Sequence, residues 1–383
     1  MEDAGDSGMT AFALRLAKHL SDADAAAGSG NNKNIVFSPV SLYAALALVA
    51  AGARRSTLSE LLALLGAASL DELTESVRRA VEVALADESA SGGPRVAYAC
   101  GVWHDEEFTL KPPYRDAAVE SFKAEVCAAN FLKQPKESRK KINKWVSKAT
   151  KQLIPEILPE GSIHTLTALV LVNAIYFKAN WSNRFFRGST TTRKFYRLDG
   201  RSVLKLPYHQ TNKQDGDQEQ LGLSMCIFLP DAHDGLAELI DKMASSGTGS
   251  FLRDHRLKYR VEVGEFRVPR FKVSFDIKLK DVLKKMGVEA AFDEDKVDLS
   301  GMLKDANNKT EPLVVEEVFH KAVIEVNEEG TKAAASTACT VKLLCARRIV
   351  NVNFVADHPF AFFVVEETSG AVLFAGHVFD PTS

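Results

Sequence analysis

The chain lacks an excess of charge of either sign. Its 48 lysines and arginines face 50 aspartates and glutamates, which leaves a net charge of −2. With so small a net charge, the protein as a whole has no long-range electrostatic attraction to nucleic acid or to an anionic membrane. An apolar run of about 20 residues, long enough to cross a bilayer, is also missing. The longest, from Val40 to Ala53, is interrupted by Ser41 and predicts a buried helix. We therefore expect neither a nucleic-acid partner nor a membrane partner.

Signals of secretion are equally scarce. The first residues, MEDAGDSGMTAF, contain neither the basic start nor the apolar stretch of a secretory signal. The five cysteines form no CxxC pair, and their odd number is typical of free thiols in a reducing compartment rather than of a disulfide framework. We expect a cytoplasmic protein, with an extracellular location by an unconventional route or after cell damage as the alternative.

Catalytic and metal-binding motifs are missing as well. The sequence has no HExxH, no GxSxG, no P-loop and no GxGxxG after a strand. Residues 5–8 read GDSG, as around a chymotrypsin-type nucleophile, but no chain precedes Ser7 to supply a histidine and an acid. His320 and His358 lie beside apolar strands, where a hydrogen-bonded core imidazole is the expected role. We predict no enzyme, no metal site and no cofactor, with a hydrolase using Ser7 as a remote alternative.

One local stretch of positive charge remains. Between Lys133 and Lys151 eight basic residues face one acid, Glu137. The stretch could bind a polyanion. From Lys140 to Leu153, however, the apolar residues form a single stripe that includes Trp145. We favour the solvated face of an amphipathic helix.

The first half of the chain has helical periodicity and the second half has the pattern of strands. Helices are predicted at Thr10–Leu20, at Val40–Ala51 after Ser38 and Pro39, and at Thr57–Leu65. Strands are predicted at Thr167–Phe177, in Val261–Ile277 with a shift near Pro269, and in a hairpin of Phe360–Glu366 and Ala371–Phe379. Helices first and strands later indicate an α+β fold.

A segment of small residues lies between two strands near the carboxyl end. It starts at Glu328, and every second residue from Thr331 to Leu343 is uncharged and mostly small. The alternate set includes Lys332, Ser336, Thr340 and Lys342. This is period-two amphipathicity, which an exposed loop needs if it is to become a strand. A flexible linker is the alternative, but a linker needs no uncharged face.

At this point the chain resembles the serpins, specifically the plant serpins of the serpin-Z type. The motifs that carry the resemblance run through nearly the whole chain: NIVFSPVSLYAALALVAAGA from Asn34, LVNAIYFKANW from Leu171, SMCIFLPDAHDGL from Ser224, HKAVIEVNEEGTKAAAS from His320, and FVADHPFAFFV from Phe354. The resemblance implies a single domain over residues 1–383. Its fold would have three β-sheets, about nine helices and an exposed reactive-centre loop at about residues 328–353.

The resemblance also implies a mechanism. A target protease attacks the loop, and the cleaved loop enters the main sheet as a new strand, so the uncleaved fold is metastable. The hinge that enters first comprises Glu328, Glu329, Gly330, Thr331, Ala333, Ala334 and Ala335. At the position of Lys332 the family usually has an acidic residue. In the inserted strand this side chain would point outward, so we expect the change to be tolerated. A sheet-opening cluster is implied at Ser38, Ser41, Asn173 and His320, with Trp181 at the insertion point.

Counting from Gly330 at the family's spacing places the bait bond between Leu344 and Cys345, whereas counting back from Phe354 shifts it by about one position. A leucine favours a chymotrypsin-like target. Arg347 and Arg348, downstream, are the alternative bait for a trypsin-like target, and a papain-like cysteine protease is possible. We expect a monomer.

One departure from the family is serious. Between Arg201 and Leu206 the chain passes from FYRLDGRSV directly to LKLPYHQ, where family members carry at least one further strand, normally part of the smaller sheet. The alternative to an irreversible protease inhibitor is therefore a non-inhibitory serpin that acts as a binding or carrier protein.

Overall fold

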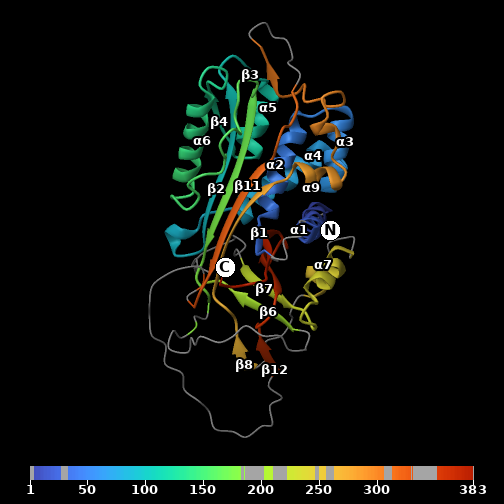
Figure 1. Cartoon of the computed structure of the whole chain (residues 1–383), viewed down its shortest axis with the longest axis vertical. Coiled ribbons are helices and arrows are strands. Elements are labelled where there is room, and N and C mark those ends of the chain that lie inside the picture. The colour runs from blue at the N-terminus through green and yellow to red at the C-terminus, as the bar shows by residue number, and fades with distance from the viewer. Residues whose placement is uncertain are drawn as a thin grey trace, which may run out of the picture.

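The computed structural model describes residues 4–26, 33–182, 185, 202–209, 222–245, 250–255, 263–305, 313–328, 330 and 352–382. The molecule is elongated, and its long sheet follows the long axis (Figure 1). Helices α2, α3, α4 and α9 lie on one side of this sheet, and α6 lies on the other (Figure 1). A second sheet, which includes β6 and β7, lies in the lower half of the view (Figure 1).

The described helices fall mainly in the first half of the chain, as predicted. They are α1 (Ala4–Ala26), α2 (Pro39–Gly52), α3 (Arg55–Leu65), α4 (Leu70–Ala84), α5 (Pro112–Asp116), α6 (Pro135–Ala149), α7 (Leu236–Ser245), α8 (Ser250–Asp254) and α9 (Lys280–Lys285), with short turns η1 (Ser89–Ser91), η2 (Ala117–Ser121) and η4 (Ala290–Phe292). Ser38 caps α2 by accepting the Ser41 N–H at 3.3 Å, and Pro39 occupies the first turn. The apolar run that predicted a buried helix is α2, whose residues are almost all buried.

The GDSG sequence lies at the start of α1. An added Cβ at Gly8 would lie 2.8 Å from the carbonyl oxygen of Leu65, at the end of α3. Glycine therefore permits close packing of two chain segments there. The motif belongs to a helix, not to the strained turn that presents a nucleophile.

The long sheet has the order β4–β2–β5–β11–β9. Its strands are β4 (Glu125–Ala129), β2 (Arg95–Asp105), β5 (Leu169–Lys178), β11 (Phe319–Val326) and β9 (Phe271–Lys278). β5 is buried along most of its length, as its apolar run predicted. It pairs antiparallel with β2, β11 pairs antiparallel with β9, and β5 and β11 are parallel to each other.

The second sheet has the order β1–β14–β13–β7–β6. Its strands are β1 (Ile35–Phe37), β14 (Val372–Val378), β13 (Phe360–Glu366), β7 (Leu223–Leu229) and β6 (Ser202–Pro207). The predicted carboxyl-terminal hairpin is the antiparallel pair β13–β14. The buried Glu366 carboxylate holds the turn between them by accepting the backbone N–H groups of Thr368 and Ser369.

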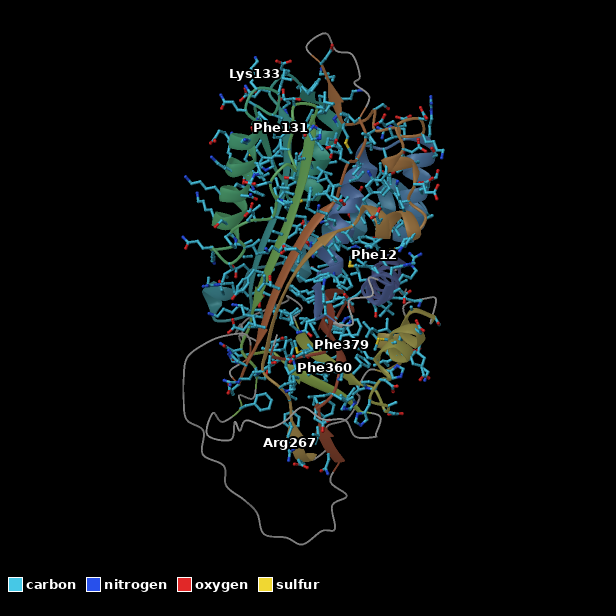
Figure 2. All side chains as sticks on the ribbon, in the orientation of Figure 1. Phe12, Phe131, Lys133, Arg267, Phe360 and Phe379 are labelled. Atoms are coloured by element: carbon cyan, nitrogen blue, oxygen red, sulfur yellow. The ribbon has the colours of Figure 1, made fainter. Side chains whose placement is uncertain are left out.

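Two short ladders complete the described strands. β8 (Val263–Arg267) pairs in parallel with β12 (Val352–Val355), and β3 (Thr109–Leu110) pairs with β10 (Leu303–Lys304). The break between β8 and β9 falls at Pro269, where the shift in alternation predicted it. Arg267 of β8 lies toward the lower tip of the molecule, and Phe360 lies above it (Figure 2). The expected three sheets of the α+β fold are present, and β3–β10 is an additional ladder.

The basic stretch forms α6, which packs on the long sheet. Trp145 meets Trp103 of β2 edge-on, with ring centroids 5.9 Å apart. The lysines of α6 are exposed, and Lys133 lies at the upper end of the molecule above Phe131 (Figure 2). This is the solvated face that the sequence favoured. One detail was wrong: the helix ends at Ala149, and Leu153 is exposed.

Candidate functional site

The parallel neighbours β5 and β11 define the candidate site. Their cross-strand register runs from the pair Asn173 and His320 to the pair Tyr176 and Val323, where the pairing stops before either strand ends. The chain that follows β11 could fold back beside it as an antiparallel strand. Such a strand would also be antiparallel to β5, so one insertion could complete both ladders.

Gly330 lies at the entrance to this gap. Its backbone N–H donates to the Asn327 carbonyl at 3.3 Å, and its carbonyl accepts the Asn327 N–H at 2.8 Å, which closes a tight turn. Gly330 also forms an antiparallel bridge with Asn180, just beyond β5. Gly330 therefore lies between the segments that follow β5 and β11.

Glycine is required at this turn for two reasons. The φ angle of Gly330 is +125°, a conformation that residues with a Cβ avoid. An added Cβ would lie 2.3 Å from the Ala179 carbonyl oxygen and 2.5 Å from the Asn180 Cα. The close approach to the end of β5 therefore depends on the missing side chain.

Trp181 covers the same entrance. Its indole Nε1 donates to the Asn327 carbonyl at 2.9 Å. The ring stacks on Tyr208 at a centroid distance of 4.5 Å and an interplanar angle of 13°. Both aromatic residues are buried. The segment after β5 is thereby attached to the turn after β11 and to the end of β6.

The predicted sheet-opening cluster is brought together beneath β5 and β11. Asn173 and His320 are direct cross-strand partners. Asn173 donates from Nδ2 to the Ser41 carbonyl at 3.0 Å, and its side-chain oxygen contacts the Ser41 hydroxyl. The Ser38 backbone N–H donates to His320 Nε2 at 3.1 Å. Each strand is thus bound to the amino-terminal turn of α2, and all four residues are buried.

This geometry defines the protonation of His320. Because Nε2 accepts a hydrogen bond, the imidazole is neutral. Burial lowers the pKa of His320 from 6.5 to about 3. His320 and His358 are core imidazoles, as expected; His358 is buried with its Nε2 at 2.8 Å from the Pro230 carbonyl.

Only two of the predicted hinge residues lie within the described part of the chain. Gly330 forms the turn, and the Glu328 carbonyl accepts the Phe185 N–H at 2.8 Å. The Glu328 carboxylate lies 3.5 Å from the Arg270 guanidinium. The remaining predicted residues lie outside the described residues: Glu329, Thr331, Ala333, Ala334, Ala335, Leu344, Cys345, Arg347 and Arg348.

Sequence reasoning missed four residues that complete the site. Asn327 and Asn180 form the bridges with Gly330, Tyr208 stacks on Trp181, and the Tyr98 hydroxyl lies 3.3 Å from Asn173 Nδ2. No local motif marks these residues. Asn327 could have been found, because it stands three residues before a glycine, at the spacing of a tight turn.

Other chemistry is sparse in the described ranges. Cys100 and Cys127 are free thiols, as expected. No group of three histidines, cysteines or acids among the described residues is placed to hold a metal ion. Within the same residues, no helix has the length and apolar character needed to cross a membrane.

The described sheets, with β5 and β11 as parallel neighbours and Gly330 bridging the segments that follow them, agree with the fold that the sequence resemblance implied. The chain matches the family described as Serpin (serine protease inhibitor) over residues 7–381. It therefore belongs to the serpin family.

Similar proteins of known sequence include plant serpins. The chain is 64% identical to Serpin-Z2A of Oryza sativa subsp. japonica, with 100% of this chain and 99% of the relative covered. It is 41% identical to Serpin-Z1C of Triticum aestivum, with 97% and 95% covered. The alignment to Serpin-Z2A spans 427 positions, against 383 residues here, so the relative carries residues that have no counterpart in this chain.

Among solved structures, the chain is similar to Arabidopsis AtSerpin1 in its native stressed conformation. The TM-score is 0.85, the identity is 34%, and both chains are covered completely. Uncleaved ovalbumin, at 23% identity and a TM-score of 0.77, shares the fold. The resemblance to plant serpins read from the sequence is confirmed.

Proposed function

We propose that this serpin is an irreversible inhibitor of a serine protease and that residues 328–353 are its reactive-centre loop. The observation that supports the proposal best is the placement of Gly330, which bridges Asn180 after β5 and Asn327 after β11. Because Gly330 lies between the segments that follow the two parallel strands, a loop that begins there would have a short path into the sheet. Small uncharged residues at every second position from Thr331 suit the buried face of the new strand.

The proposed reaction is a proteolysis that stops at the ester intermediate. The protease serine attacks the carbonyl carbon of Leu344, the Leu344–Cys345 peptide bond breaks, and Cys345 leaves with a new amino group. Leu344 remains attached to the protease as an ester. The freed loop then pairs with β5 and β11 and carries the protease away before water can hydrolyse the ester. The new ladder and the buried apolar face stabilise the product.

The bait sequence supports a chymotrypsin-like target, because Leu344 suits an apolar pocket. Cleavage after Arg347 or Arg348 would instead indicate a trypsin-like target, and a papain-like cysteine protease is a third possibility. A cytoplasmic location is part of the proposal, since the free thiols of Cys100 and Cys127 suit a reducing compartment.

A non-inhibitory serpin that binds or carries another molecule is the second candidate. The observation in its favour is the departure between Arg201 and Leu206. β6, which begins at Ser202, is the last strand of its sheet in the described part of the chain. Loss of a neighbouring strand beside Trp181 and Tyr208 could impair insertion.

The decisive test incubates the protein with chymotrypsin, trypsin and papain and resolves the products by denaturing electrophoresis. A covalent complex that resists SDS, together with mass spectrometry showing the Leu344 ester, supports inhibition. Complete cleavage of the loop with full recovery of protease activity would support the non-inhibitory candidate.

A further inference from the structure

A cavity of about 470 Å³ lies beside the carboxyl end of α2, away from the site described above. The starts of α4 and α5 and the segment that precedes β10 form its other walls, all in the upper half of the view in Figure 1. Every residue that lines the cavity belongs to the described part of the chain. The volume is in the range of pockets that hold small organic molecules.

Hydrogen bonds between distant segments fix the walls of this cavity. The Gly301 N–H donates to the Gly52 carbonyl at 3.0 Å, and an added Cβ on Gly301 would lie 2.7 Å from the same oxygen. The Lys111 N–H donates to the Met302 carbonyl at 2.8 Å, and the Lys111 ammonium donates to the Ser300 carbonyl at 2.7 Å. Three segments that are far apart in the sequence are thereby joined around the cavity, so it is a preformed feature of the fold.

Part of the lining is apolar. Leu70, Pro113 and Ala117 line the cavity together with the buried ring of Tyr114. Burial raises the pKa of the Tyr114 hydroxyl above its usual value of 10, so this wall carries no charge at neutral pH. The same hydroxyl has no hydrogen-bond partner among the described residues. An aromatic or aliphatic body suits this part of the lining.

The charged part of the lining has more positive than negative groups. It consists of two cations, Arg54 and Lys111, and one acid, Asp71. Asp71 lies in the first turn of α4, where the positive end of the helix dipole offsets its charge. The Nη1 atom of Arg54 donates to the Ala51 and Ala53 carbonyls at 3.3 Å and 2.6 Å. Its Nη2 and Nε atoms make no hydrogen bond with the described residues, so the guanidinium is held in place with donors left for a carboxylate.

We propose that this cavity binds a small organic carboxylate with an aromatic or other apolar body. The carboxylate pairs with the remaining donors of Arg54, and the body packs against the ring of Tyr114. Asp298 does not take the place of the ligand, because its carboxylate is ion-paired with Arg55 at 3.6 Å. A small surplus of positive charge suits one carboxylate and is too little for a polyphosphate or a nucleic acid. This inference does not depend on protease inhibition.

Isothermal titration calorimetry with 2-naphthoate tests the proposal on the full chain. The wild-type protein should bind one equivalent saturably, and the neutral analogue 2-naphthamide should bind about tenfold more weakly. Arg54→Gln should weaken 2-naphthoate binding by about the same factor. Arg115→Gln is the matched control, because Arg115 follows Tyr114 on α5 but is not among the residues that line the cavity. It should bind 2-naphthoate like the wild type.

A second variant and a second measurement locate the ligand. Ala117→Phe fills the cavity and should abolish binding, while thermal melting shows whether the variant is folded. If it does not fold, photo-crosslinking of the wild type with 4-benzoylbenzoate decides. Labelling should fall on peptides that contain Leu70, Pro113 or Tyr114 and should disappear in excess 2-naphthoate.

Four outcomes would overturn the proposal. They are the absence of saturable 2-naphthoate binding, equal affinity for 2-naphthamide, unchanged affinity in Arg54→Gln, and photo-labelling confined to peptides outside the cavity.

Discussion

The indole of Trp181 donates to the backbone carbonyl of Asn327 at 2.9 Å, so a residue just beyond β5 directly holds the turn that follows β11. The bond spans the place where a strand would enter. The proposed loop insertion would therefore have to break or move this bond, which contributes to the stability of the uncleaved form. A hydrogen bond of this kind contributes about 1 kcal/mol.

Cleavage of the loop should raise thermal stability. A new central strand adds ladder hydrogen bonds and apolar contacts that the intact loop forgoes. The test is to compare the melting midpoints of intact protein and protein nicked between Ala338 and Arg348. An unchanged or lower midpoint would show that the loop cannot insert.

Gly330→Ala should destabilise the native protein. The added Cβ meets the Ala179 carbonyl and must adopt a φ of +125°, a strain of about 1–3 kcal/mol before the overlap is counted. Gly287→Ala is the matched control, because Gly287 has a φ of +94° but nothing within 4 Å of an added Cβ. Denaturant unfolding should show the larger loss for Gly330→Ala. Equal losses would mean that the chain does not pass close to β5.

Acid should weaken the fold through His320. Burial lowers its folded pKa to about 3 from 6.5, so below pH 6.5 the unfolded chain binds a proton that the folded chain refuses. Stability therefore falls as the pH drops from 6.5 toward 3, by up to about 1.4 kcal/mol per pH unit. His377, whose pKa burial lowers to about 4, acts in the same direction.

His320→Gln isolates the contribution of His320, since glutamine can still accept the Ser38 N–H without titrating. The free energy of unfolding, measured from pH 7 to pH 4, should depend less steeply on pH in the variant. Identical slopes would show that His320 is not buried and neutral in the native protein.

Thr331→Arg should convert an inhibitor into a substrate. In the proposed register Thr331 enters the sheet on the inward face, where an unpaired charge costs several kcal/mol. The variant should be cut at the wild-type bond and release active protease. Lys332→Arg, on the outward face, is the control and should inhibit normally. Trapping at the wild-type ratio by Thr331→Arg contradicts the register.

Cys345 should react with thiol reagents before Cys100, Cys127 and Cys226. Burial raises the pKa of Cys100 to about 11, whereas Arg347 and Arg348 next to Cys345 favour the thiolate. Peptide mapping after limited alkylation should identify Cys345 first, and the modified protein should inhibit a chymotrypsin-like protease less well. A Cys345→Ser variant should be insensitive to the reagent. Protection of Cys345 would place the bait bond elsewhere.

Local signals in the sequence were enough for much of the fold. The cap at Ser38, the apolar run of α2 and the carboxyl-terminal hairpin each depend on residues close together in the chain. The end of α6 was misjudged because the apolar stripe continues to Leu153. Lys151 and Gln152, which follow the helix, both have positive φ angles. No local sequence pattern predicts this turn.

The site itself was only partly predictable. The resemblance placed Asn173 and His320 in one cluster, but periodicity could not show that they are direct cross-strand partners, because strand register between distant segments is set by tertiary packing. The contact of Trp181 with Asn327 depends likewise on where two strands end. Among the described residues β6 is the last strand of its sheet, next to the departure that the sequence shows near Arg201.

The parallel pairing of β5 and β11 has a consequence for the order of folding. On the edge that faces away from β9, β11 has two competing partners. One is β5, which is far away in the sequence, and the other is the segment that immediately follows β11. Closing a short hairpin is fast, about microseconds, whereas closing a long loop is slow and entropically costly. The uncleaved fold must therefore form against a kinetic preference for local pairing. Under the proposed mechanism, early pairing of that segment with β11 would fill the sheet before any protease arrives, so inhibition would depend on the order in which the strands pair.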